Sequence, residues 1–359
     1  MDRLSMDRVP AALQPFVRVL AAAPDHLRSV ALLLSNMRTR LDAVEAGQLA
    51  MELRRLAPHD HVIRLLTESV VRRSVRLCQY ACVNDDGRNE AFDRALRGCV
   101  GSESIVLDIG TGSGLLAMMA ARAGARHVYA VEHEPLVADA ARKNIHSNGL
   151  SDRITVIGKD VLDVRVGEDL PVACDVLVQD IIFAEPFSGG LLKVLQYARS
   201  RLLTNHAVLL PDEIEIVGAL LGQDSQLPPV SANSKCGFDL SAMDMFQPPV
   251  VDVSRPFRPE RALSDATRIV SFDLGCPSGI DAAKTIASIV PTMSGRAIGL
   301  LYWLKLHLHG STFEDVPARR SSRGLMLAYF SPPLDVTAGR EVALRTECIG
   351  DRIAVDVVR

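Results

Sequence analysis

The sequence predicts an α/β fold followed by a β fold: a doubly wound parallel sheet, then an antiparallel region, with a helical extension at the N-terminus. Three observations predict it. Apolar residues recur at helical spacing over 1–70, strands and helices alternate over 71–210, and period-two strands fill 211–359. Alternating strands and helices are typical of a parallel sheet covered by helices, whereas consecutive strands pair with one another. We therefore expect three regions with these boundaries.

Composition narrows the class of protein. The chain has 359 residues, 48% of them hydrophobic and 23% charged, which excludes a disordered or fibrous class. The 40 basic and 43 acidic side chains leave a formal charge of -3, so we expect no nucleic-acid partner. The longest apolar runs are shorter than the roughly 18 to 20 residues of a membrane helix, and no signal peptide is recognised. We expect a cytoplasmic protein without a membrane partner.

Cysteine and histidine spacing predicts neither disulfides nor metal. The seven cysteines, at positions 78, 82, 99, 174, 236, 276 and 348, are odd in number and show no CxxC spacing. A disulfide framework or a zinc site is therefore not expected. His307 and His309 alternate along one predicted strand, but no third ligand lies near them in the sequence, and an exposed strand face is the better interpretation.

The N-terminal region predicts two helices, at 27–38 and 41–56, which would form an antiparallel hairpin. Leu41, Leu49 and Leu56 belong to one apolar stripe of the second helix. The hairpin is reminiscent of one tetratricopeptide-like unit, but a single unit shows no repeat period. A helical cap is the simpler interpretation.

The central region begins with a strand that is predicted to be buried. The run Ser104-Ile105-Val106-Leu107-Asp108 is apolar and ends in an acid, as expected for a buried parallel strand. After a glycine-rich turn the pattern alternates, with helices at 115–123 and 136–147 and strands at 127–132, 154–158 and 175–180. This βαβ rhythm predicts a doubly wound sheet.

The rhythm stops after Pro211, and the rest of the chain predicts antiparallel β structure. Its period-two strands are expected at 213–220, 267–274, 297–308, 325–330 and 341–357. The segment 222–262 is long for a connection, is rich in Pro, Ser and Asp, and contains one apolar stretch at 238–246. We expect it to form an interaction arm.

The strongest chemical signal is the turn Asp108-Ile109-Gly110-Thr111-Gly112-Ser113-Gly114. Its glycines let a ligand approach the backbone, and the helix that follows presents N–H groups without intrahelical partners. Glu132 ends the next strand, where a carboxylate can accept both ribose hydroxyls of a nucleoside. The GxGxG spacing fits the GxGxxG fingerprint of nicotinamide dinucleotides poorly, so an oxidoreductase is a weaker alternative.

Three runs together resemble one family. They are Asn84-Asp85-Asp86-Gly87-Arg88-Asn89-Glu90-Ala91-Phe92, the stretch 106–116, and Val128-Tyr129-Ala130-Val131-Glu132. They resemble the protein arginine methyltransferases, class I S-adenosylmethionine-dependent enzymes, and within them the divergent members with helical N-terminal extensions. The resemblance covers residues 75–359, including 237–241. It implies a Rossmann-like domain that binds S-adenosylmethionine and a β-barrel-like domain for substrate and dimerisation.

The resemblance also implies a donor site. Arg88 should hold the donor carboxylate, since an arginine can bind it bidentately, Glu132 the ribose, and residues 160–161 the adenine edge. Tyr80 should either close over the donor or pack in the core. The full set of expected cofactor-binding residues is Tyr80, Arg88, Asp108, Gly110, Thr111, Gly112, Gly114, Glu132, Asp160 and Val161.

The acceptor site departs from the family pattern. Two glutamates on the family's loop after the fourth strand grip the substrate guanidinium, a planar cation. Asp180 stands where the first belongs and Gly189 where the second does, so Glu185 is the candidate replacement. The family's His-Trp loop should precede 325–330, but Ser321-Ser322-Arg323-Gly324 stands there. The expected catalytic residues are therefore Asp180 and Glu185.

These residues favour methyl transfer from S-adenosylmethionine, with N-methylation of a guanidino or amino group on a protein, peptide or small molecule. The missing acid at Gly189 also motivates an alternative, a catalytically inactive dimeric scaffold.

The resemblance further implies a homodimer formed through the arm at 222–262. The apolar side chains of the arm would either anchor the partner or pack on their own β domain; they are Leu240, Met243, Met245 and Phe246.

Overall fold

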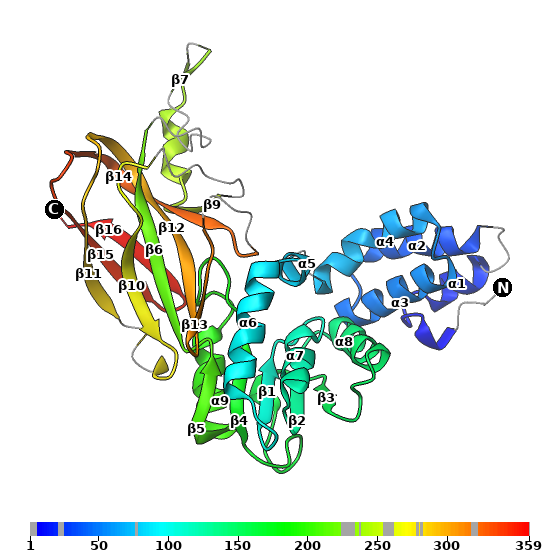
Figure 1. Ribbon diagram of the computed structural model, residues 1–359. Helices are drawn as coiled ribbons and strands as arrows, with labels where there is room; N and C mark the ends of the chain where they lie inside the picture. Colours follow the sequence, from blue (N-terminus) through cyan, green and yellow to red (C-terminus); the bar gives the residue numbers. More distant parts are fainter. Residues whose placement is uncertain are drawn as a thin grey trace.

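The structure is a computed structural model, and it describes residues 6–20, 25–75, 78–223, 234–236, 238–253, 262–277, 280, 283–316 and 322–358. Along the chain it passes from N-terminal helices through a parallel sheet to antiparallel sheets, and the helices and the antiparallel sheets lie on opposite sides of Figure 1. The predicted fold class, α/β followed by β with a helical extension, is confirmed. The boundaries at residues 70 and 210 stay predictions.

The N-terminal helices have a core of their own. After a short 3-10 turn, Met6–Arg8, they are α1 (Gln14–Leu20), α2 (His26–Met37), α3 (Ala43–Leu56) and α4 (His61–Ser74). The carboxylates of Asp42 and Asp60 accept two backbone N–H bonds each at the starts of α3 and α4, which fixes where these helices begin. Leu34, Leu49 and Ile63 are buried between the helices. The hairpin predicted at 27–56 is therefore extended by α4, and α3 packs against the parallel region at α8.

The parallel sheet has the order β3-β2-β1-β4-β5. Its strands are β1 (Ile105–Ile109), β2 (His127–Val131), β3 (Ile154–Ile157), β4 (Cys174–Gln179) and β5 (Leu203–Leu210). Its helices are α5 (Cys78–Val83), α6 (Asp86–Cys99), α7 (Leu115–Ala123), α8 (Pro135–Ser147) and α9 (Leu191–Arg201), with a 3-10 turn, η2 (Val161–Asp163). The strand order reverses between β1 and β4, which is where doubly wound sheets bind ligands.

The antiparallel part contains two larger sheets. The first has the order β10-β6-β12-β14-β9, with β13 paired to β12, and the second has the order β11-β15-β16. β10 contacts β11 and β15, and β14 contacts β16, so the two sheets share a core. The strands are β6 (Glu213–Gly222), β9 (Val250–Val253), β10 (Thr267–Asp273), β11 (Lys284–Ile289), β12 (Gly295–Leu308), β13 (Ser311–Glu314), β14 (Leu325–Val336), β15 (Val342–Ile349) and β16 (Arg352–Val357).

Some elements differ from the prediction. The strand expected at 341–357 is two strands, because the chain turns at Gly350, whose φ is 62°. The helix α9 and the strands β5 and β11 were not predicted. β11 is mostly exposed and mixes polar with apolar residues, so its periodicity is weak.

The expected arm lies partly outside the described residues. Its described part contains β7 (Ser234–Lys235), β8 (Phe238–Asp239), the 3-10 turn η3 (Ser241–Phe246) and β9. β7 projects beyond the sheets at the top of Figure 1. None of the helices among the described residues is long and apolar enough to cross a membrane.

One helix joins the two halves. α6 packs against α7 of the parallel region and against β12 and β13 of the antiparallel region. At its first turn the Asp85 carboxylate accepts the N–H of Arg88 at 3.1 Å and the N–H of Ser322, just before β14, also at 3.1 Å. The start of α6 therefore brings the segment before β14 to the edge of the parallel sheet.

Candidate active site

A cavity of about 910 Å³ opens at the carboxyl ends of the parallel strands. Most of its lining comes from the loops after β1, β2, β3 and β4. The segment before β14 and single residues of β9 and β14 line it from the antiparallel part. The cavity thus lies at the switch point of the sheet, between the two halves of the chain.

The glycine loop forms one wall and depends on its glycines. Gly110, Gly112 and Gly114 have φ values of 71°, 55° and 84°, in the left-handed region that favours glycine. A Cβ at Gly110 would lie 2.3 Å from Cγ2 of Ile181. The N–H of Gly110 donates to the carbonyl of Val131 at 2.9 Å, which holds the loop against β2. The loop therefore gives a ligand access to backbone atoms.

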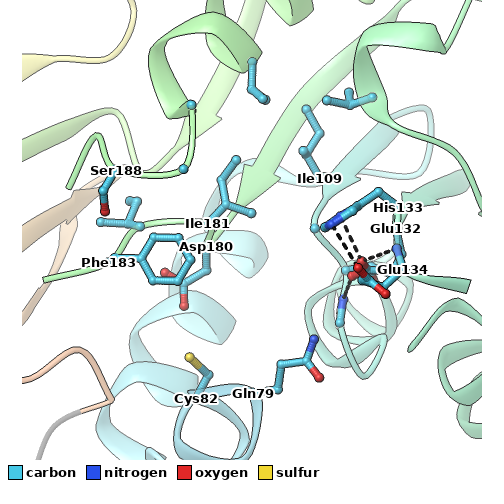
Figure 2. A pocket seen from close by; sticks show the side chains of 18 of the residues that line it. Gln79, Cys82, Ile109, Glu132, His133, Glu134, Asp180, Ile181, Phe183 and Ser188 are labelled. Atoms are coloured by element: carbon cyan, nitrogen blue, oxygen red, sulfur yellow. Dashed lines mark hydrogen bonds and ion pairs between the residues drawn. The ribbon is translucent and has the colours of Figure 1, made fainter. Parts of the chain in front are cut away.

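Glu132 is fixed at the end of β2. Its side chain is buried, and its two oxygens accept the N–H of Gly112 and the N–H of Glu134, both at 3.0 Å. Nδ1 of His133 lies 3.3 Å from the same carboxylate. Figure 2 shows this group on the side of the cavity opposite Asp180. A carboxylate held this way presents its remaining lone pairs to hydroxyl groups, as the ribose assignment requires.

Asp108 lies beneath the glycine loop rather than on the cavity wall. It is fully buried in β1 and accepts the hydroxyl of Thr111 at 2.5 Å. Burial raises the pKa of Asp108 to about 7, and the Thr111 hydrogen bond and the charge of Arg88 offset only part of this. Thr111 does line the cavity. Asp108 therefore shapes the loop through Thr111.

Arg88 of α6 binds Asp180 at the end of β4. Nε and Nη2 of Arg88 both lie 2.8 Å from Oδ2 of Asp180. Nη1 donates to Oδ1 of Asn89 at 2.8 Å, and the ring of Phe92 lies 4.8 Å from the guanidinium. Both side chains of the ion pair line the cavity, although each is about 95% buried, with side-chain exposures of 6% and 5%.

A second guanidinium reaches Asp180. Nη2 of Arg323 donates to Oδ1 of Asp180, and Nη1 donates to Oδ2 of Asp315 at 3.4 Å. Burial lowers the pKa of Arg323, but the charges of Asp180 and Asp315 outweigh it and raise the pKa above its usual value. The sequence identified this loop only by the residues that it lacks, whereas the structure places Arg323 in the site. Ser321 lies outside the described residues.

The path of the loop after β4 explains why Gly189 stands where the family pattern has a second glutamate. Phe187 is buried and packs edge-on against Phe272, with ring centroids 4.9 Å apart, which anchors the loop on the antiparallel part. Gly189 has φ 95°, and a Cβ there would lie 3.0 Å from the ring of Phe183. A glutamate at this position would be strained, so the loop's path and its missing carboxylate go together. Glu185 lines the cavity, as does Gly189.

The structure adds a carboxylate that the sequence analysis missed. Asp252 of β9 lines the cavity, and β9 pairs with β14 so that Asp252 lies opposite Met326, another lining residue. The sequence analysis placed Asp252 in the arm. No local pattern could have found it, because only the pairing of β9 with β14 brings it to the site.

Of the remaining predicted residues, two line the cavity, whereas Gly114 and Tyr80 do not. Asp160 and Val161 line the cavity after β3, and Asp160 accepts the N–H of Leu162 at 3.0 Å, which begins the turn η2. Tyr80 is 64% exposed and does not line the cavity; Gln79 and Cys82 do so from the same helix, as Figure 2 shows.

The two histidines of the β12 region do not share a strand face. His309 lies in the turn after β12, with φ 43°. Nε2 of His307 lies 3.3 Å from Oε1 of Glu215, whose other oxygen is 3.2 Å from Nζ of Lys305. The ligand atoms of Glu213, Glu215 and His307 lie within 4.8 Å of one another, a third ligand that the sequence did not reveal, but Lys305 and Arg268 already compensate the charge of Glu215.

Comparison with known proteins adds to this geometry. Residues 92–194 match the model of the ribosomal protein L11 methyltransferase (PrmA) family. An arginine N(omega)-methyltransferase of Streptomyces achromogenes subsp. streptozoticus is 35% identical over 282 residues, which cover 77% of each chain. Protein arginine N-methyltransferase 7 of Cricetulus longicaudatus is 31% identical over 248 residues, which cover 63% of this chain but 36% of that protein.

Solved structures share the fold. The Trypanosoma brucei PRMT1 enzyme-prozyme heterotetrameric complex with AdoHcy matches with a TM-score of 0.70 at 18% identity, over 79% of this chain and 93% of that chain. Protein arginine methyltransferase 10 of Arabidopsis thaliana matches with a TM-score of 0.62 at 20% identity, over 76% and 88%. At these identities the likeness concerns the fold.

Proposed function

This chain belongs to the arginine methyltransferase family, and from that premise we propose that it transfers the methyl group of S-adenosylmethionine to a terminal nitrogen of an arginine guanidinium. That it is an S-adenosylmethionine-dependent N-methyltransferase follows from its relatives. The acceptor and the roles of the individual residues are our proposal.

One observation carries the choice of acceptor. Asp180 stands at the cavity and already binds two guanidinium groups of the chain itself, those of Arg88 and Arg323. A carboxylate accepts the parallel N–H groups of a guanidinium better than it accepts a single ammonium. Asp180 is therefore a carboxylate suited to a guanidinium, and an arginine acceptor would take the place of one that the chain now supplies.

The donor half of the proposal uses the glycine loop and Glu132, on the side of the cavity opposite Asp180, together with Arg88, which is paired with Asp180. Arg88 would hold the donor carboxylate, the loop from Gly110 to Gly112 its methionine end, and Glu132 its ribose hydroxyls. Asp160 and Val161 would meet the adenine edge. All of these residues line the same cavity, which supports the binding of a single donor molecule there.

The acceptor half orients the nitrogen. S-adenosylmethionine supplies an electrophilic methyl group on its sulfonium. Asp180 and Glu185 would hold the acceptor guanidinium so that one nitrogen faces that methyl. The nitrogen–methyl bond would form as the sulfur–methyl bond breaks, S-adenosylhomocysteine would leave, and the proton lost from the nitrogen would pass to solvent. Alignment and exclusion of water supply most of the rate enhancement in such a transfer.

Free L-arginine is the first acceptor to test. The Streptomyces relative, whose alignment covers 77% of each chain, is named for arginine, whereas the hamster relative is named for protein arginine. Both acceptors carry the same guanidinium. The relatives are named as enzymes, so they lend no support to the inactive scaffold.

We also propose a homodimer formed through the arm, in the cytoplasm. The described part of the arm exposes apolar side chains: Phe238 is 69%, Met245 79% and Phe246 69% exposed. Leu240 and Met243 are exposed beside them. Such a patch favours burial against a partner. Light scattering that gives a monomeric mass would refute the dimer.

The test of function is transfer of labelled methyl groups. The purified protein is incubated with methyl-labelled S-adenosylmethionine and either L-arginine or an arginine-containing peptide, and the products are hydrolysed and separated. We expect labelled methylarginine. Donor binding by calorimetry without label in either acceptor would contradict the proposal and support the scaffold.

A further inference from the structure

Both oxygens of Asp180 are occupied by the chain's own arginines. Arg88 contributes two nitrogens to Oδ2, and Arg323 contributes Nη2 to Oδ1. An acceptor guanidinium that binds Asp180 must therefore compete with a guanidinium that is already present. The proposed function assigns Arg88 to the donor carboxylate, so Arg323 is the arginine that an acceptor guanidinium would displace from Oδ1 of Asp180.

Arg323 has a second partner that can hold it. Oδ2 of Asp315 lies 3.4 Å from Nη1, and the side chain of Asp315 is fully buried next to β13. The ring of Phe313 lies 5.5 Å from the guanidinium. Asp315 does not line the cavity, whereas Asp180 does. Arg323 is thus shared between a carboxylate inside the acceptor site and one outside it.

The bonds of Arg323 are incomplete in this arrangement. Its bond to Asp315 is long for a charged pair, and its buried Nε has no hydrogen-bond partner among the described residues. A shift of the guanidinium toward Asp315 would shorten one bond while it releases Asp180. Because Asp315 keeps the cation paired, the release does not leave a buried charge without a partner.

We propose that Arg323 determines acceptor specificity by competing for Asp180 and yielding only to another guanidinium. This inference rests on the proposed function, in which Asp180 holds the acceptor. A guanidinium replaces the planar donor that Asp180 loses. An ammonium is a compact, strongly hydrated charge and replaces it poorly, and a neutral acceptor leaves the buried pair intact. Arg323 thereby excludes amine acceptors such as L-lysine.

Two variants test the competition in opposite directions. Asp315→Asn removes the outside partner, so Arg323 stays on Asp180, and acceptor binding should weaken by about tenfold. The double variant Arg323→Met with Asp315→Asn removes the competitor, and acceptor binding should tighten by about tenfold. Replacing Arg323 alone would remove a cation from beside the fully buried Asp315 and destabilise the fold, so the double variant is preferred.

The readout is calorimetric binding of L-arginine to protein saturated with S-adenosylhomocysteine, or of an arginine peptide if only that peptide is labelled in the transfer assay. L-Lysine is titrated in parallel, and the double variant should narrow the preference for the arginine acceptor. Arg268→Met is the matched control, because Arg268 is an exposed arginine of β10 that pairs with Glu215 and does not line the cavity. Its affinity for the acceptor should equal that of the wild type.

The outcomes distinguish the proposed function from the specificity role of Arg323. If the wild type binds and methylates the arginine acceptor, but the two variants shift its affinity in the same direction or leave it unchanged, the role of Arg323 is refuted and the proposed function stands. If the wild type neither binds nor methylates any guanidino acceptor, both are refuted. A double variant that still excludes L-lysine as strongly as the wild type would refute the specificity role.

Discussion

The two sides of the cavity are built in different ways. The donor side consists of the glycine loop and Glu132, which follow the neighbouring parallel strands β1 and β2. Gly112, which donates its N–H to Glu132, is only 20 residues before it in the sequence. The acceptor side joins Asp180 to Arg323, which is 143 residues further along the chain, and adds Asp252 from β9. Local sequence therefore specifies the first side, and tertiary packing assembles the second. The predictions below test whether the two sides are separable.

The largest expected effect is at Asp180. Asp180→Asn keeps the shape of the side chain but removes the charge that orients the acceptor, so kcat/KM for L-arginine should fall on the order of 100- to 1,000-fold. Affinity for S-adenosylhomocysteine, measured by calorimetry, should change by less than about threefold. Equal losses in kcat/KM for L-arginine and in affinity for S-adenosylhomocysteine would show that the donor and acceptor sides are not separable.

A smaller, opposite pattern is expected at Glu132. Glu132→Ala removes the acceptor of two backbone N–H groups and of the ribose hydroxyls, and should weaken donor binding by about 30-fold, or about 2 kcal/mol. Binding titrations with S-adenosylhomocysteine measure this. Asp139→Ala is the control, since Asp139 is an exposed acid of α8 that pairs with Arg142 and does not line the cavity. Unchanged donor affinity in Glu132→Ala would remove Glu132 from the donor site.

The second acceptor carboxylate is either Glu185 or Asp252. We expect Glu185→Gln to raise the KM for L-arginine by about tenfold, since one charged hydrogen-bond partner is lost, and Asp252→Asn to raise it by less than about twofold. Steady-state kinetics with both variants compare them directly. A larger increase in KM for Asp252→Asn than for Glu185→Gln would make Asp252 of β9 the second acceptor carboxylate.

The smallest expected effect is a pH dependence of stability from Asp108. Its pKa rises from the usual 3.8 to about 7, mainly through burial, so the folded protein binds more protons than the unfolded chain between these values. Stability from this group is therefore lost as pH rises, by about 1 kcal/mol between pH 6 and pH 7. Urea unfolding of the wild type and of Asp108→Asn should show this loss only in the wild type. Parallel pH profiles would contradict it.

The same contrast explains what the sequence could predict. The glycine loop, Glu132 and residues 160–161 were found because each follows an apolar strand whose pattern is visible locally. Tyr80 was placed by resemblance, and the structure shows that it is 64% exposed.

Arg323 and Asp252 could not be found, because their place depends on strand pairing between distant segments. In the fold, the alternation of strands and helices predicted the parallel sheet. The mixed burial of β5 and β11 concealed both strands.

The first turn of α6 sets a limit on exchanging parts between relatives. Asp85 binds the segment before β14, while Arg88, one turn later, binds the end of β4. The two contacts are matched to each other through one rigid helical turn. A chimera that takes its antiparallel half from a relative must therefore inherit residues 85–88 and 322–323 from the same parent. If these two segments came from different parents, each half would fold, but the contacts between the halves at the cavity would not match.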